Sequence, residues 1–146
     1  MTDITTVRAL RGALRPHSDA PLRLLVGGVG HAAFHVTEVR HQAVDALDCG
    51  GGGHARAEAV AQVLLGGAEG MRARTLDGIL ARTVSRDPRV EAAALSLEVG
   101  PPGLSRFVVA GVVPGPDGLT LRLEPMEAAC APARQRAVAC EPACCA

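Results

Sequence analysis

The apolar residues of this chain repeat with two different periods, and this pattern restricts the possible folds more than any other feature. Leu119, Leu121 and Leu123 alternate with polar residues, which is typical of a β-strand that buries one face. Leu76 and Leu80 belong to a segment whose apolar residues recur every three or four positions, which predicts an α-helix. Both periods occur in one chain of 146 residues, so the sequence predicts a domain that combines helices with a sheet.

Two segments have helical spacing. The apolar positions of the first are Ile4, Val7, Leu10 and Leu14. Thr2 and Asp3 are its candidate N-caps, because short polar side chains accept hydrogen bonds from the first turn. The second helix is expected to start at Thr75 and to cover residues 76–84. Each of the two segments is followed by a proline, which ends a helix.

Five further segments carry strand signals, and a sixth is ambiguous. The five span residues 22–26, 34–47, 95–99, 107–113 and 119–123. Residues 114–118 read Pro-Gly-Pro-Asp-Gly, which predicts the turn of a hairpin between the last two strands. Residues 54–65 fit a helix by composition and a strand by alternation.

The periodicity ends at Pro125, and alanine, proline and cysteine dominate the residues that follow. We therefore expect one α+β domain over residues 1–125, followed by a flexible, disordered Cys-rich tail over residues 126–146. The domain is expected to be a mostly antiparallel sheet of about six strands with two helices on one face.

The composition excludes several classes of partner. The basic residues are all arginine and are balanced by an equal number of acidic residues, so no net charge attracts nucleic acid or an anionic membrane. Only Phe34 and Phe107 are aromatic, which is too few for a base-stacking surface. The start of the chain lacks the pattern of a signal peptide, and no apolar run is long enough to span a membrane. We expect a cytoplasmic protein that binds neither nucleic acid nor membrane.

A glycine-rich segment after the first strand matches part of a dinucleotide-binding fingerprint. It runs from Gly28 to Ala33 and has Asp48 20 residues beyond Gly28. That fingerprint requires a helix directly after its glycines, whereas residues 34–39 favour a strand. The pattern therefore disfavours nucleotide binding, and a Walker-type phosphate loop is excluded because the chain has no lysine.

Four of the five cysteines lie within the last 17 residues. They are Cys130, Cys140, Cys144 and Cys145. Thiolates are soft ligands, so this cluster predicts binding of a soft metal or metalloid ion such as arsenite, zinc or copper(I). Arg134 and Arg136 lie nearby and favour the thiolate form.

The fifth cysteine suggests a second candidate site. Cys49 follows Asp48 at the start of a glycine run, and three histidines lie close in sequence: His35, His41 and His54. An even separation places His35 and His41 on the same face of a regular strand, and it places Glu38 on the opposite face. These residues form either a metal or reactive-thiol site, or a small buried cysteine among solvated histidines.

Two short motifs give the chain a family resemblance. His35-Val36-Thr37-Glu38-Val39 and Asp48-Cys49-Gly50-Gly51, with the strand and helix after them, resemble a small uncharacterised bacterial family whose members neighbour arsenic-resistance genes. The resemblance covers residues 5–125, implies that residues 54–65 form a strand, and places Asp48 and Cys49 in the family signature. It departs after the last strand, where only Cys130 matches a His-Thr-Asp-Cys motif of the family.

Three functions remain open from the sequence. The first is a cytoplasmic accessory protein of arsenic or heavy-metal response that binds its ion through the tail thiolates. The second is a non-catalytic protein-interaction module whose sheet and glycine loop contact a protein partner. The third is a small thiol- or metal-dependent enzyme centred on Cys49. The residues favour a non-catalytic protein over an enzyme, because they contain no recognised catalytic motif.

Overall fold

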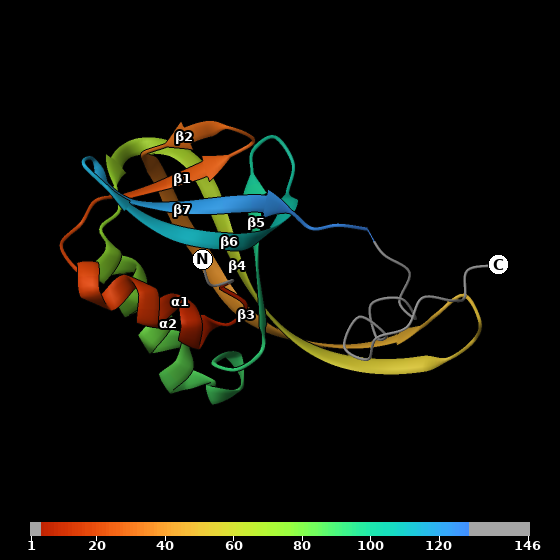
Figure 1. Cartoon of the computed structure of the whole chain (residues 1–146). Coiled ribbons are helices and arrows are strands. Elements are labelled where there is room, and N and C mark those ends of the chain that lie inside the picture. Colours follow the sequence, from red (N-terminus) through yellow and green to blue (C-terminus); the bar gives the residue numbers. More distant parts are fainter. Residues whose placement is uncertain (1–3, 129–146) are drawn as a thin grey trace.

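The structure is a computed structural model that describes residues 4–128, in which two α-helices lie beside one seven-stranded sheet (Figure 1). The helices are α1 (Val7–Leu14) and α2 (Ala73–Arg86), and short 3-10 turns follow them at Arg15–His17 and Pro88–Val90. The strands are β1 (Leu22–Val26), β2 (Val29–His31), β3 (Ala33–Leu47), β4 (Gly53–Gly70), β5 (Ala94–Gly100), β6 (Ser105–Gly115) and β7 (Gly118–Pro125).

The structure agrees with the expected α+β class, but the sheet is mixed and has seven strands rather than about six mostly antiparallel ones. Its strand order is β2-β1-β7-β6-β5-β4-β3, and the neighbouring pairs β1/β7 and β4/β5 are parallel. The chain passes through α2 between β4 and β5, and such a crossover makes the two strands parallel. The seventh strand, β2, has only three residues in a glycine-rich segment and carries no alternation that could predict it.

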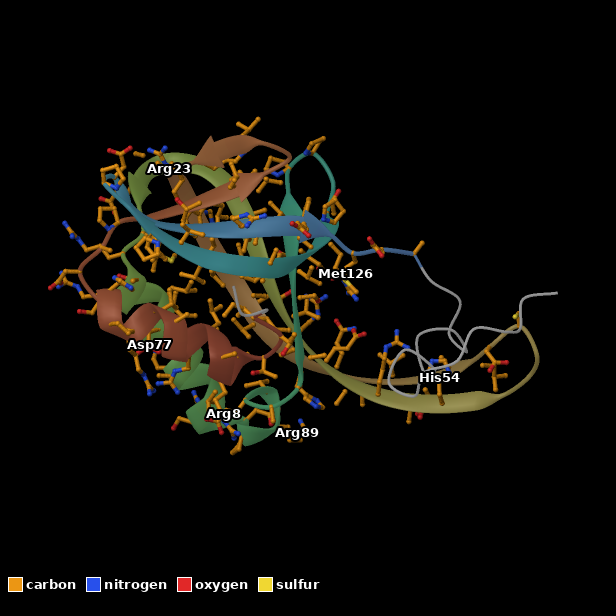
Figure 2. All side chains as sticks on the ribbon, viewed as in Figure 1. Arg8, Arg23, His54, Asp77, Arg89 and Met126 are labelled. Atoms are coloured by element: carbon orange, nitrogen blue, oxygen red, sulfur yellow. The ribbon has the colours of Figure 1, made fainter. Side chains whose placement is uncertain are left out.

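Both helices pack on the same face of the sheet, as expected (Figure 1). Each helix buries one apolar stripe against the core. The buried residues are Val7, Leu10 and Leu14 in α1 and Ala73, Leu76 and Leu80 in α2. The helices are also joined to each other, because Arg11 Nε donates to Asp77 Oδ1 at 2.7 Å. Figure 2 shows Asp77 beside the two helices.

The ambiguous residues 54–65 lie within β4, so the strand implied by the family resemblance is present. The hairpin turn between β6 and β7 also lies where the sequence predicted it, with Gly115 opposite Gly118. The last strand ends at Pro125, where the periodicity of the sequence ends. Among the described residues, the helices are too short or too polar to span a membrane.

A β-bulge at Thr37 explains why the alternation in β3 is imperfect. Val36 faces Val63 and Glu38 faces Gln62, so Thr37 is one extra residue in β3. An extra residue reverses the faces of the side chains that follow it. Val36 and Val39, although three positions apart, therefore both pack toward the helices.

The ends of β3 and β4 form an arm that extends beyond the rest of the sheet (Figure 1). Residues 43–47 pair with residues 53–57, and β5 begins to pair with β4 only at Glu58. This arm, residues 43–57, is thus a two-stranded ribbon, and the loop at its tip contains Cys49.

The helix caps differ from those that the sequence predicted. The N-cap of α1 is Thr6, whose hydroxyl accepts from Ala9 N at 3.1 Å. Helix α2 begins two residues before Thr75, after Arg72, and has no side-chain cap. Both segments begin after an extended residue, and the choice of cap depends on that backbone rather than on residue type alone.

We expect Thr6→Ala to lower the free energy of unfolding by about 1 kcal/mol, because the first turn of α1 loses its cap. Thr75→Ala is the matched control, since Thr75 is exposed inside the first turn of α2 and caps nothing. It should change the free energy by less than about 0.5 kcal/mol. Urea unfolding of both variants measures the difference, and equal losses would contradict the assignment of Thr6 as the cap.

Candidate functional site

The residues of the predicted Cys49 site are spread along the β3–β4 hairpin. Cys49 is exposed in the loop at the tip of the arm. Asp48 closes that loop, because its Oδ1 accepts from the backbone N–H groups of Gly50 and Gly52, each at 2.9 Å. Its carboxylate therefore has a structural role at this turn.

The three histidines are not gathered around Cys49. His35 is in register with Leu64 and His41 with Ala59, and the bulge at Thr37 puts the two histidines on opposite faces. The expectation that they share a face is therefore wrong, and Glu38 lies on the same face as His35. His54 lies on the arm (Figure 2), where its Nε2 is 3.2 Å from Arg56 Nη1.

Within residues 4–128, no group of three or more His, Cys, Asp or Glu side chains is arranged to hold a metal ion. The four cysteines of the tail lie outside the described residues. The structure therefore does not place Cys49 with His35, His41 and His54, and it has no bearing on the predicted thiolate cluster at Cys130, Cys140, Cys144 and Cys145.

The sheet face opposite the helices carries a network of charged side chains that sequence analysis missed. We call this set the charge network: Glu38, Arg40, Arg56, Glu58, Glu98 and Arg106. Its three arginines and three glutamates alternate in contact, so the network as a whole is neutral. It spans the four adjacent strands from β3 to β6.

Glu98 is the centre of this network. Its Oε1 accepts from Arg40 Nη2 at 2.5 Å and from Arg106 Nη2 at 2.9 Å. Arg106 stands opposite Glu98 on β6, whereas Arg40 comes from β3 and must cross β4 to reach it. The hydrogen bond from Arg106, and after it the one from Arg40, lowers the pKa of Glu98 below its ordinary value of 4.5.

Glu58 forms the second half of the network. Its Oε1 accepts from Arg56 Nε at 2.8 Å, and its Oε2 lies 3.3 Å from Arg106 Nη1. Arg106 thus bridges the two carboxylates of β4 and β5 with one guanidinium. The sequence shows charged residues at alternate positions within a strand, which is typical of an exposed sheet face. It does not show which strands are neighbours, so it could not predict the network.

A cavity of about 370 Å³ lies beside Glu58, where β5 and β6 separate. The pairing of these strands covers only Leu97 to Val99, opposite Phe107 to Ser105. Beyond it, residues 4–6 enter between the strands: Leu95 N donates to Thr5 O at 2.9 Å, and Ile4 N donates to Val109 O at 3.3 Å. The first residues of the described chain therefore form one wall of the cavity.

Comparison of the chain with models of known protein families, with curated proteins and with solved structures finds no match. The function is accordingly inferred from the chain's own residues.

We expect Glu98→Gln to lower the free energy of unfolding by about 1.5–3 kcal/mol at pH 7, because two arginines lose their shared carboxylate. The pKa of Glu98 is lower in the folded state than its ordinary value of 4.5. Its contribution to the free energy of unfolding is therefore fully present above about pH 4.5 and is lost as the pH falls through the lowered, folded-state pKa. The difference between the variant and the parent protein should therefore shrink below pH 4.5.

The control for this experiment is Glu124→Gln. Glu124 pairs with Arg122 at 3.4 Å on an exposed part of β7, where an ion pair contributes little. Its unfolding free energy should change by less than about 0.5 kcal/mol at any pH. Urea unfolding between pH 3 and pH 7 provides both measurements, and a loss for Glu98→Gln that does not depend on pH would contradict the role of its charge.

Proposed function

We propose that this chain is a non-catalytic interaction module that contacts a protein partner through its arm, residues 43–57. The observation that carries the proposal is the two-stranded ribbon that projects beyond the sheet. An isolated two-stranded ribbon is at best marginally stable in water. Its extension away from the core is therefore better explained by a contact outside the domain than by the needs of the fold.

The chemistry of the arm suits recognition of an extended protein segment. Over residues 43–57, neither edge of the ribbon pairs with another strand of the part of the chain that the structure describes, so both edges can offer backbone N–H and C=O groups. A partner strand can add to such an edge through main-chain hydrogen bonds. Leu47, 78% exposed near the tip, provides an apolar side chain for the same contact.

The first experiment identifies the partner with a photo-crosslinking amino acid at position 47. Position 29 is the control, because Val29 is also an exposed apolar residue, 57% exposed, but lies on β2 at the opposite end of the sheet. We expect one defined protein adduct from position 47, identified by mass spectrometry, and no such adduct from position 29. Equal labelling from both positions would contradict a contact through the arm.

The second experiment measures binding of that purified partner to a shortened arm. Val44 and Arg56 face each other in register, so residues 45–55 can be replaced by Asn-Gly, a pair that favours a two-residue hairpin turn. We expect the unfolding midpoint to change little, because no core residue is removed, and the affinity for the partner to fall at least tenfold. Unchanged affinity would show that the arm is not the binding surface.

Binding of a soft ion by the tail is a second candidate function, and the four clustered cysteines support it. With this function the chain would be an accessory protein of arsenic or heavy-metal response, in keeping with the family resemblance. The ion would then be arsenite, zinc or copper(I), bound through Cys130, Cys140, Cys144 and Cys145. Nothing in this function requires the arm, so the two proposals are tested separately.

We expect Cys144→Ser with Cys145→Ser to weaken arsenite binding by at least a hundredfold, because neighbouring thiolates bind one ion at high effective concentration. Cys49→Ser is the control, since Cys49 is exposed on the arm and far in sequence from the tail. Its affinity should equal that of the parent protein. Equilibrium dialysis of the phosphine-reduced proteins measures all three, and equal binding by the double variant would exclude the tail as the site.

A further inference from the structure

The cavity between β5 and β6 has polar and apolar walls that no part of the proposed function uses. Its volume of about 370 Å³ is within the range of pockets that hold small molecules. Ser96 and Glu58 line it from β5 and β4, and Thr5 and Glu124 line it from other sides. It belongs to the body of the domain, because none of its lining residues comes from the arm.

Ser96 is the first observation that points to a ligand. Its side chain lines the cavity, yet the residue is only 5% exposed. Its hydroxyl has no hydrogen-bond partner within residues 4–128. The hydroxyl is not among the fully buried polar atoms of the described residues, so it is accessible from the cavity and can hydrogen-bond to a molecule held there.

The charge of the cavity walls indicates which ligand would fit. Among residues 4–128, the two charged residues that line it, Glu58 and Glu124, are acidic, and no arginine does so. Glu58 is buried and is held in place by Arg56 and Arg106, neither of which lines the cavity. A carboxylate has room for about four hydrogen bonds, so Glu58 can still accept from a ligand. The walls thus favour a cationic hydrogen-bond donor.

The remaining walls are aliphatic. Ile4 and Leu95 lie on the inner side, and Val108 and Met126 are large apolar side chains that remain 36% and 40% exposed. Figure 2 shows Met126 just beyond the end of β7. Burial of these side chains by an alkyl group would be favourable. The described lining contains no aromatic ring, so it does not offer the cation–π contacts that favour quaternary ammonium ligands.

We propose that this cavity is a binding site for a small aliphatic primary amine in its ammonium form. The ammonium group donates hydrogen bonds to Glu58 and to the hydroxyl of Ser96, which satisfies the polar wall. The alkyl chain lies against Val108 and Met126 and covers their exposed surface. This site is independent of the arm and of the tail thiolates.

The probe is hexylamine at pH 7, where it is protonated, titrated into the ¹⁵N-labelled full-length protein. We expect saturable shifts of the amide signals of residues 95–96, 108–110 and 126, which surround the cavity. Hexanol and hexanoate are the matched neutral and anionic probes, and each should bind at least tenfold more weakly. Equal or tighter binding of either would overturn the proposed ligand class.

Two substitutions on β6 locate the site. Val108→Arg places a guanidinium at the cavity, whereas Val113→Arg places the same group on the same face of the same strand but away from the cavity. Val108 and Val113 are almost equally exposed, at 36% and 38%, so both variants should fold. We expect Val108→Arg to weaken hexylammonium binding at least tenfold and Val113→Arg to leave it within twofold. Equal effects of the two substitutions would overturn the site.

Ser96→Ala tests the hydroxyl itself. Removal of this group should weaken hexylammonium binding by about tenfold to a hundredfold, in line with the loss of one hydrogen bond to a charged group. The same variant should not lose stability in the absence of the amine, because the hydroxyl has no partner to lose within residues 4–128. Unchanged amine affinity in a folded Ser96→Ala protein would remove the hydroxyl from the proposed site.

Discussion

The ion pairs between Arg40, Glu98, Arg106 and Glu58 stabilise the face of the sheet that the helices do not cover. The two helices cover one face only, so the other face must be protected by its own side chains. Arg40 reaches across β4 and Arg106 reaches across the gap from β6 to β4, and long arginine side chains can cover apolar surface along their stems. Val60 lies between these residues on the same face and is fully buried.

This arrangement also constrains which strands are neighbours. Glu98 has arginine partners on β3 and β6, and Glu58 is joined to Arg106 on β6. A shift in register would break these pairs and leave the partly buried charge of Glu98 without a partner. An unpaired buried charge is strongly destabilising, even where a complete ion pair adds little net stability. The network is therefore better understood as a device that specifies the mixed order of β3 to β6 than as a source of stability alone.

The elements that sequence predicted are those whose signal is local. Most of the helix faces, β1, β7 and the turn before β7 depend on nearby residues only, and they lie where the periodicity placed them. Ile4 is an exception, because it precedes the first helix and pairs with Val109. The faces of His35 and His41 were predicted wrongly because the bulge at Thr37 lies between them and reverses the alternation. This bulge depends on pairing with β4, where the Thr37 hydroxyl donates to Gln62 at 2.9 Å, so nearby residues alone do not reveal it. The parallel pairs, the charge network and the cavity were not predictable, since each depends on strands that are distant in sequence.

The proposed cavity site and the tail are close along the chain. Met126 lines the cavity, and Cys130 follows it by four residues. The arm lies elsewhere in the domain and contributes no residue to the cavity. The proposed protein-binding surface and the proposed ammonium site therefore lie in separate parts of the domain.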